Sequence, residues 1–349
     1  MIFILWLDRI LLLLNNRKNE KMKRESNIEL LRLLCMFLII VNHMLGHGVL
    51  LDPTVAGGPM ELLCYDIGSS IWMPAALVFI LISGYFGIHP TMKGIARFAF
   101  VCTFYLVISG LMGGVKSVSL FFKTCCILSS ATGLWFISAY FYLYCLSPML
   151  NAYMNTLSVR DFRKYILVFL LFEIGIGWVM ESQTYNHVIL MMLIYSIGYY
   201  LGHSNDEWIQ RITVKKCILV WLLPTAVLFS SQYFHLGRPF SNLSYTNPFI
   251  LLQAVMILLI FTKWKMPYRC GINYLAKSAL MVYLVTSNVH TRDYFAEMVQ
   301  FCYTSLNGIL LLLVLILLFV CLFFGLLLLD KLVAKIYNPL FNVLIQWKK

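Results

Sequence analysis

One stretch of the sequence combines an apolar run long enough to cross a bilayer with ionisable side chains inside that run. Residues 27–50 contain Glu29, Arg32, Asn42, His43 and His47. Arg32 and His43 are eleven residues apart, so in a helix they lie on one face, about 16 Å apart along the axis. Glu29 is placed to pair with Arg32, and His47 shares the face of His43. The stretch therefore predicts one helix with a cation near its start and an imidazole deep inside.

Two interpretations of this polar stripe stay open from the residues alone. Ionisable side chains within a membrane are costly and often mark a functional path. Alternatively, an arginine near a helix end extends to the headgroups, and a membrane histidine hydrogen-bonds between packed helices. A second intramembrane carboxylate, Glu173, also requires a partner, for which His187 and Arg32 are candidates.

The composition indicates a polytopic membrane protein and argues against a nucleic-acid partner. Hydrophobic residues make up 61% of the chain and charged residues 12%. The net charge of +12 arises from basic residues in short loops between apolar segments. Retention of positive charge on the cytoplasmic side explains that pattern. The ten cysteines show no metal-ligand spacing, and no phosphate-binding glycine loop is present, so no metal is expected.

The hydropathy pattern predicts an all-α fold of about ten transmembrane helices with both termini cytoplasmic. The segments are 28–50, 67–88, 95–115, 133–152, 165–181, 187–202, 217–235, 248–262, 272–290 and 308–329. With this topology 22 of the 27 lysines and arginines lie inside and four lie outside. The bias fixes the orientation. Arg32 then lies near the cytoplasmic end of its helix, and His43 lies beyond the midplane toward the outside.

The chain is expected to hold one membrane domain, residues 27–335, between two short flanking segments. Residues 1–26 form a basic N-terminal segment. It is expected to be an interfacial helix, or else translation begins at Met22 and the first 21 residues are not part of the protein. Residues 336–349 are expected to form a short cytoplasmic tail. The last span is apolar all round and is expected to face lipid.

Several short motifs, in order, resemble the membrane-bound acyltransferase family 3. They are Arg32, ten residues, then His43; Ser83-Gly84-Tyr85 at the end of the second span; Leu134-Trp135-Phe136 with Tyr140, Pro148 and Asn151; and the GYYLG run of the sixth span. Two positions depart from the pattern. Lys93 and Arg97 are four apart where two arginines three apart are common, and Thr286 occupies the place of a frequent second histidine.

The resemblance implies a bacterial enzyme of the cytoplasmic membrane that transfers an acyl group, commonly acetyl, to a hydroxyl of a surface or exported glycan. The donor would be cytoplasmic acyl-CoA, with no permanently bound cofactor. Imidazole titrates near working pH, so His43 is the expected general base. Arg32 and Glu29 complete the catalytic group, as a pair that orients the helix or with Arg32 on a CoA phosphate.

The other expected site residues follow from the same resemblance. Substrate-binding positions are Asn42, Ser83, Trp135, Tyr140, Tyr144 and Asn288, and Lys93 and Arg97 are candidates for the CoA phosphates. Asn288, His290 and Arg292 follow the place of the frequent second histidine. The role of that histidine is then either absent here or taken by His290. Ser83-Gly84 is also suited to close helix packing.

Two other functions remain as alternatives. A glycolipid or polysaccharide transporter would use the polar stripe as a permeation path. Against it, no inverted repeat and no Gly/Pro-interrupted helix pair is evident in the sequence. A non-catalytic partner in polysaccharide assembly is the other alternative, which the departure at Thr286 favours.

Overall fold

The computed structural model describes residues 25–50, 59–114, 117–180, 187–237 and 243–346, and in these ranges the chain is helical, without strands. The helices are α2 (Ser26–Leu50), α3 (Pro59–Trp72), α4 (Pro74–Phe86), α5 (Met92–Met112), α6 (Val118–Cys125), α7 (Trp135–Thr156), α8 (Val159–Glu173), α9 (His187–His203), α10 (Glu207–Arg211), α11 (Val214–Tyr233), α12 (Pro248–Lys263), α13 (Cys270–Ala276), α14 (Ala279–Thr286), α15 (Arg292–Ser305) and α16 (Gly308–Gln346). A π-helical turn, Ile174–Val179, follows α8.

Five of the described helical stretches are long and apolar enough to cross a bilayer, and shorter apolar helices lie among them. The all-α, polytopic membrane architecture expected from hydropathy is therefore confirmed. Each of the ten expected segments coincides largely with helix, and α6, α10 and α15 are additional. The interpretations of residues 1–24, including the choice between Met1 and Met22, lie outside the described residues.

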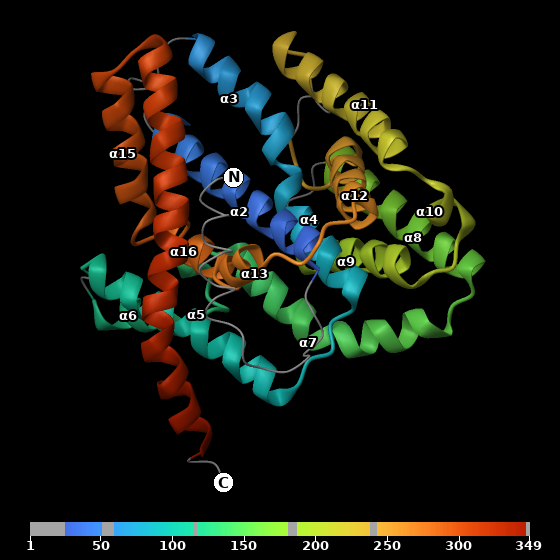
Figure 1. The fold of residues 1–349 in the computed structure, drawn as a ribbon, viewed down its shortest axis with the longest axis horizontal. Helices are drawn as coiled ribbons and strands as arrows, with labels where there is room; N and C mark the ends of the chain where they lie inside the picture. The colour runs from blue at the N-terminus through green and yellow to red at the C-terminus, as the bar shows by residue number, and fades with distance from the viewer. Residues whose placement is uncertain (1–24, 51–58, 115–116, 181–186, 238–242, 347–349) are drawn as a thin grey trace.

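Helix α2 lies at the centre of the molecule, with α15 and α16 on one side and α11 and α12 on the other (Figure 1). Polar contacts fix its first turn. The hydroxyl of Ser26 accepts from the backbone N–H of Arg269 at 2.7 Å, and the side chain of Asn27 donates to the carbonyl of Phe261 at 2.8 Å. These contacts tie α2 to α12 and to the start of α13, and so set the height of Arg32 and His43 in the bundle.

Helices α4 and α9 touch at the backbone, and glycines make that contact possible. A methyl group added at Gly84 would lie 2.1 Å from the carbonyl oxygen of Tyr195, and one at Gly198 would lie 2.3 Å from that of Leu81. In a membrane, small residues let two helix backbones approach closely, and the helices gain van der Waals contacts as a result. The packing role expected for the Ser83-Gly84 pair therefore applies to Gly84, while Ser83 faces elsewhere.

Replacing Gly84 with alanine is expected to destabilise the bundle, because the new methyl group meets backbone atoms that cannot move aside. Overpacking of a core typically costs about 1–3 kcal/mol. The matched control is Gly325→Ala in α16, where nothing lies within 4 Å of the added carbon. Thermal unfolding in detergent should show a lower Tm for G84A and an unchanged or slightly higher Tm for G325A. Equal Tm values would contradict the close packing.

Two of the expected spans each contain a short turn between two helical stretches. The second span divides into α3 and α4 at Met73, with Pro74 at the first position of α4. The ninth divides into α13 and α14 at Lys277 and Ser278. The backbone keeps right-handed helical angles at Met73, Lys277 and Ser278, so each turn is a local distortion within one helical segment.

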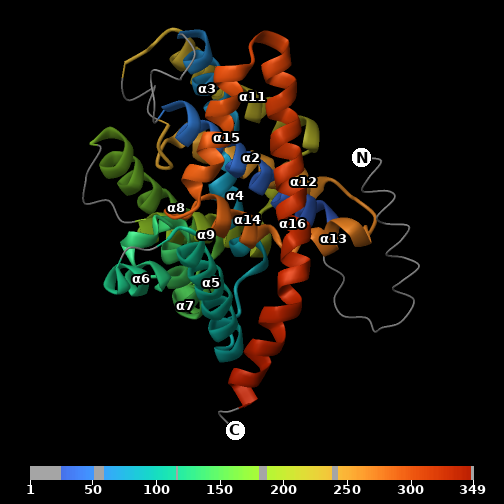
Figure 2. The same cartoon turned by 90° about the vertical axis from the view of Figure 1, so that its left-hand side faces the viewer.

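Helix α16 is longer than the sequence predicts and runs the height of the molecule (Figure 2). The expected cytoplasmic tail of residues 336–349 begins within this helix, which continues to Gln346 with Tyr337 and Phe341 buried. The helix also has a buried side, which includes Leu315 and Leu327, so it does not face lipid all round. The apolar periodicity simply extends beyond the length needed to cross the bilayer.

Buried polar contacts hold α16 against the α13–α14 turn. The carboxylate of Asp330 accepts hydrogen bonds from the hydroxyls of Tyr105, at 2.6 Å, and of Ser278. Asp330 is 4% exposed, and Tyr337 lies 3.4 Å from the same carboxylate. A buried carboxylate needs such donors. Because Ser278 follows Lys277, the network fixes the position of that lysine as well.

A second polar cluster joins α8, α9 and α10 in the part of the chain that the charge pattern assigns to the cytoplasm. Arg163 donates two hydrogen bonds to the carboxylate of Asp206, one at 2.7 Å from Nε and one at 2.5 Å from Nη2. Tyr200 donates to the same carboxylate. The hydrogen bonds from Arg163, and then that from Tyr200, hold the pKa of Asp206 below its usual value.

Candidate active site

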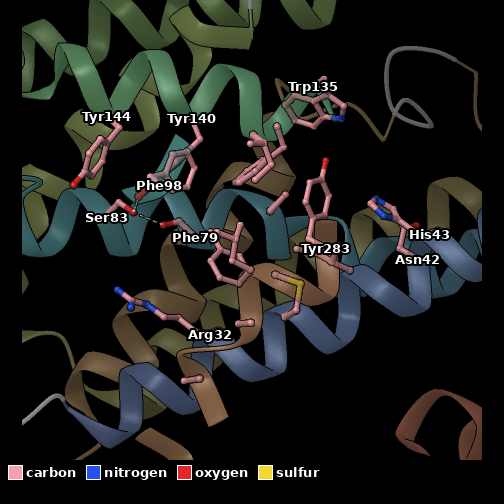
Figure 3. Close-up of a pocket in the computed structure, with 18 of the residues that line it drawn as sticks. Arg32, Asn42, His43, Phe79, Ser83, Phe98, Trp135, Tyr140, Tyr144 and Tyr283 are labelled. Carbon is pink, nitrogen blue, oxygen red and sulfur yellow. Dashed lines mark hydrogen bonds between the residues drawn. The ribbon is translucent and has the colours of Figure 1, made fainter. Parts of the chain in front are cut away.

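A cavity of about 600 Å³ lies beside α2 and extends along the face that carries Arg32 and His43 (Figure 3). Both residues line it, which agrees with the shared face that their spacing predicts. The remaining walls come from α3, α4, α5, α7, the residues before α12, and the α13–α14 region. Both turns contribute, through Met73 and Lys277.

The Arg32 end of the cavity is cationic. The cationic side chains that line the cavity are Arg32, Arg97 of α5 and Lys277. Phe98, the neighbour of Arg97, stacks on Tyr144 with ring centroids 6.0 Å apart, and Figure 3 shows Tyr144 toward the Arg32 end. Lys277 follows α13, which is tied to Ser26 at the start of α2 through Asn273, at 2.5 Å. These contacts bring the segments of Arg97 and Lys277 toward the start of α2, and the guanidinium of Arg97 also donates to Oδ1 of Asn338 in α16 at 2.7 Å.

Glu29 partly neutralises this end. Its Oε1 lies 3.3 Å from Nη1 of Arg32, and the Glu29 side chain is 6% exposed whereas that of Arg32 is 29% exposed. The expected i,i+3 pair is therefore present. Glu29 does not line the cavity, so it contacts the site through Arg32. Its place is that of a residue that orients the guanidinium.

The opposite end of the cavity carries His43 with aromatic side chains. Asn42, Trp72, Trp135 and Tyr245 line the cavity together with His43. The ring of Tyr283 lies 5.7 Å from that of His43, and His47 lies 6.1 Å away. The Nδ1 atom of His43 is hydrogen-bonded to the hydroxyl of Ser287. This end therefore offers one imidazole, one amide and broad aromatic surfaces.

Trp135 belongs to an aromatic group that joins α7, α9 and the segment before α12. Its ring centroid lies 4.3 Å from that of His187 and 5.3 Å from that of Tyr245. His187 is therefore packed on Trp135. Glu173 is 5% exposed, and its Oε2 has no hydrogen-bond partner within the described ranges.

Between the two ends, the wall is apolar apart from one pair of hydroxyls. Ser83 and Tyr140 are hydrogen-bonded to each other at 2.9 Å, and Tyr140 is stacked between Phe136 and Tyr144. Phe79 lies between Arg32 and Tyr283 in Figure 3. The expected residues Ser83, Trp135, Tyr140 and Tyr144 thus reach one cavity from two helices.

Besides Glu29, two of the expected site residues lie away from the cavity lining. Lys93 is exposed in the first turn of α5, whereas Arg97, one turn later, lines the cavity. Asn288 is fully buried in the turn after α14, where its Oδ1 accepts from the N–H of His290 at 2.8 Å. Thr286 and His290 do not line the cavity either. The Oδ1 atom of Asn288 thus contacts a turn, and the substrate-binding role that the resemblance implies stays a prediction.

The structure also adds residues that local sequence patterns did not single out. Lys277, Tyr283 and Tyr245 line the cavity, and Ser287 contacts His43. Each is separated by more than 180 residues from α2, so periodicity along one helix could not reveal it. The only available signal was the count of cytoplasmic lysines and arginines, which includes Lys277 but gives it no partner.

The fold and the cavity define a multi-pass membrane protein with an intramembrane site that is cationic at one end and carries an imidazole at the other. The family model described as an acyltransferase domain, of the acyltransferase 3 family, matches residues 25–330. The chain therefore belongs to this family of membrane acyltransferases, as the motifs indicate. Neither a curated protein nor a solved structure matches the chain.

Proposed function

We propose that the protein transfers an acyl group, most simply acetyl, from cytoplasmic acyl-CoA to a hydroxyl of a surface or exported glycan, with His43 as general base. The observation that carries the proposal is the distribution of groups along one cavity. Three cations line the cavity, Arg32, Arg97 and Lys277, and the imidazole of His43 lies about 16 Å from Arg32 along α2. Acyl transfer from a phosphorylated donor requires these two kinds of group at separate places.

The donor belongs at the cationic end. Arg32, Arg97 and Lys277 match the phosphates of CoA, because guanidinium and ammonium groups bind phosphate oxygens by charge-assisted hydrogen bonds. In acyl-CoA the thioester lies at the far end of a flexible arm, remote from the phosphates. An arm laid along the apolar wall of Met36, Ile39 and Phe79 would bring the thioester toward His43.

The acceptor belongs at the His43 end. Trp72, Trp135 and Tyr245 present aromatic surfaces of the kind that pack against sugar rings. The charge pattern assigns Trp135 and Tyr245 to the outer side of the membrane, and assigns Arg97 and Lys277 to the cytoplasmic side. The two ends of the cavity thus agree with a donor made in the cytoplasm and a glycan assembled outside, as in the cytoplasmic membrane of a bacterium.

The reaction follows from the groups at this end. His43 takes the proton of the sugar hydroxyl as its oxygen attacks the thioester carbonyl. The tetrahedral intermediate carries a negative oxygen, for which the amide of Asn42 is a donor of suitable chemistry. Collapse of the intermediate breaks the carbon–sulfur bond. The imidazolium then returns its proton to the departing CoA thiolate, and the ester and the free thiol are released.

The sidedness of the donor can be tested with sealed membrane vesicles. Radiolabelled acetyl-CoA does not cross a bilayer, so only inverted vesicles, whose cytoplasmic face is outward, should transfer label to polysaccharide. Right-side-out vesicles should stay unlabelled until they are permeabilised. A reporter fused after Arg163 should read cytoplasmic in the same cells. Labelling of intact right-side-out vesicles would contradict the proposed orientation of the cavity.

The same experiment separates the transporter alternative. The turns between α3 and α4 and between α13 and α14 resemble the interrupted helices at which the sites of transporters lie. A transporter would move glycan without forming a covalent ester. Label that is released from polysaccharide as acetate by mild base identifies acyl transfer, and its complete absence from active membranes would favour transport or a non-catalytic role.

A further inference from the structure

The imidazole of His43 makes contacts on two sides. His43 lines the cavity, yet its Nδ1 is hydrogen-bonded to the hydroxyl of Ser287, which lies 244 residues further along the chain. Ser287 follows the last residue of α14, is 7% exposed and does not line the cavity. Nδ1 therefore contacts the protein interior, and Nε2 is the nitrogen available to the cavity.

The turn that carries Ser287 is held by hydrogen bonds independent of His43. The N–H of Ser287 donates to the carbonyl of Tyr283 at 3.0 Å, and the N–H of Arg292 donates to that of Asn288 at 2.8 Å. The N–H of Val289 reaches the carbonyl of Thr132 at 3.3 Å. The hydroxyl of Ser287 is therefore presented to α2 at a fixed place.

We propose that Ser287 is the positioning residue of His43: its hydroxyl oxygen accepts the Nδ1–H and so keeps the lone pair of Nε2 in the cavity. The inference rests on the proposed function, in which His43 acts as base. A neutral imidazole carries its proton on one nitrogen, and the partner of the other nitrogen selects which. With the proton on Nδ1, Nε2 accepts the proton of the sugar hydroxyl and later returns it. With the proton on Nε2 instead, this nitrogen could only donate a hydrogen bond and could not take up the proton of the sugar hydroxyl.

The geometry favours this role over that of a nucleophile. An acyl-serine would require the thioester carbon to reach the Ser287 oxygen, but Ser287 is buried outside the cavity lining. The other neighbours of the imidazole, Tyr283 and His47, contact it as rings with centroids 5.7 and 6.1 Å away. Such packing limits where the ring lies without selecting the protonated nitrogen. Ser287 is the neighbour whose hydrogen bond to the ring is described.

The neighbouring Thr286 provides a matched control. It is 2% exposed, and its hydroxyl donates to the carbonyl of Val282 at 2.8 Å, within α14. Thr286→Val thus removes a buried hydroxyl from the same turn without touching His43. Ser287→Ala removes the contact to His43, and Ser287→Thr retains a hydroxyl. A merely structural effect would appear in both T286V and S287A, whereas loss of positioning appears in S287A alone.

The first measurement reads the protonated nitrogen directly. The full chain is labelled with ¹⁵N-histidine, and the His43 signal is identified by its loss in His43→Gln. We expect the Nδ1–H tautomer in the wild type and in S287T, and a mixture of tautomers in S287A. An Nε2–H tautomer in the wild type, or an unchanged tautomer in S287A, would overturn the proposal. This readout does not depend on activity.

The second measurement is release of CoA thiol from acetyl-CoA in membranes that contain the native acceptor. We expect kcat of S287A to fall roughly 10- to 100-fold, by analogy with the loss seen when the hydrogen-bond partner of a metal-bound histidine is removed. The KM for acetyl-CoA should stay unchanged, T286V should be near wild type, and S287T should regain most of the rate. Unchanged kcat in S287A, equal losses in T286V, or an acyl group trapped on Ser287 would each contradict the role.

The two proposals fail in different ways. If His43→Gln retains activity, the base assignment fails, whatever tautomer the wild type shows. If His43→Gln is inactive while S287A keeps both the wild-type tautomer and the wild-type kcat, the base assignment stands and the positioning role of Ser287 fails.

Discussion

Replacing His43 with glutamine should abolish acyl transfer while the protein still inserts and accumulates in the membrane. Glutamine keeps hydrogen-bonding groups near Ser287 but cannot take up the proton of the attacking hydroxyl. Loss of a general base typically lowers a rate by about 10²–10⁴. His43→Ala should be equally inactive, because the missing function is proton transfer and not packing. The assay is base-released O-acetyl from purified surface polysaccharide, normalised to protein in the membrane fraction.

His47→Gln is the matched control for this variant. His47 lies one turn further along α2, with its ring 6.1 Å from that of His43, and does not line the cavity. The same substitution at His47 should therefore leave most of the activity. Near-normal acetylation in H43Q would remove His43 as the base, and comparable losses in H43Q and H47Q would indicate a packing defect in α2.

Replacing Arg32 with lysine should weaken the donor while leaving the chemical step intact. Lysine retains the charge beside the buried Glu29 but loses the planar fork that binds two oxygens of one phosphate. A hydrogen bond to a charged group contributes about 1.5–3 kcal/mol. The KM for acetyl-CoA should thus rise roughly 10- to 100-fold, with kcat at saturation close to wild type. Thiol release at varied acetyl-CoA concentration measures both.

Arg211→Lys controls for a general effect of this exchange. Arg211 also pairs with a glutamate of its own helix, Glu207, at 2.8 Å, but both side chains are exposed on α10, away from the cavity. Its KM should be unchanged. A fall in kcat without a change in KM for R32K would move Arg32 from donor binding to the chemical step. If R32K changed neither KM nor kcat, the proposed contact between Arg32 and a CoA phosphate would be contradicted.

The sequence predicted the parts of the site that lie along one helix. The spacing of Glu29, Arg32 and His43 required only the geometry of an α-helix, and the structure has the ion pair and the shared face. The motif around Trp135 and Tyr140 likewise gave two residues of the cavity wall. Their catalytic and binding roles stay predictions, which the experiments above address.

The parts that could not be predicted depend on contacts between distant segments. Lys277 lines the cavity at the turn between α13 and α14, where hydropathy shows only a continuous apolar span. The Ser287–His43 contact joins residues 244 apart. The contact of the Asn288 side chain with the turn after α14 was not predicted either, and its substrate-binding role stays a prediction. Helix α16 continues to Gln346, beyond the expected span of 308–329. A membrane helix can extend past the length that crosses the bilayer, so hydropathy does not predict where it ends.

The apolar part of the wall between the two ends of the cavity affects whether the cavity can conduct ions. Ile39, Phe79, Phe136 and Leu280 offer no hydrogen bonds from their side chains to a file of water. Side chains of this kind disfavour a continuous file of water, and a stretch without water conducts neither protons nor ions. A membrane that holds a voltage can therefore contain a cavity between its donor and acceptor sides with little leak of ions through it.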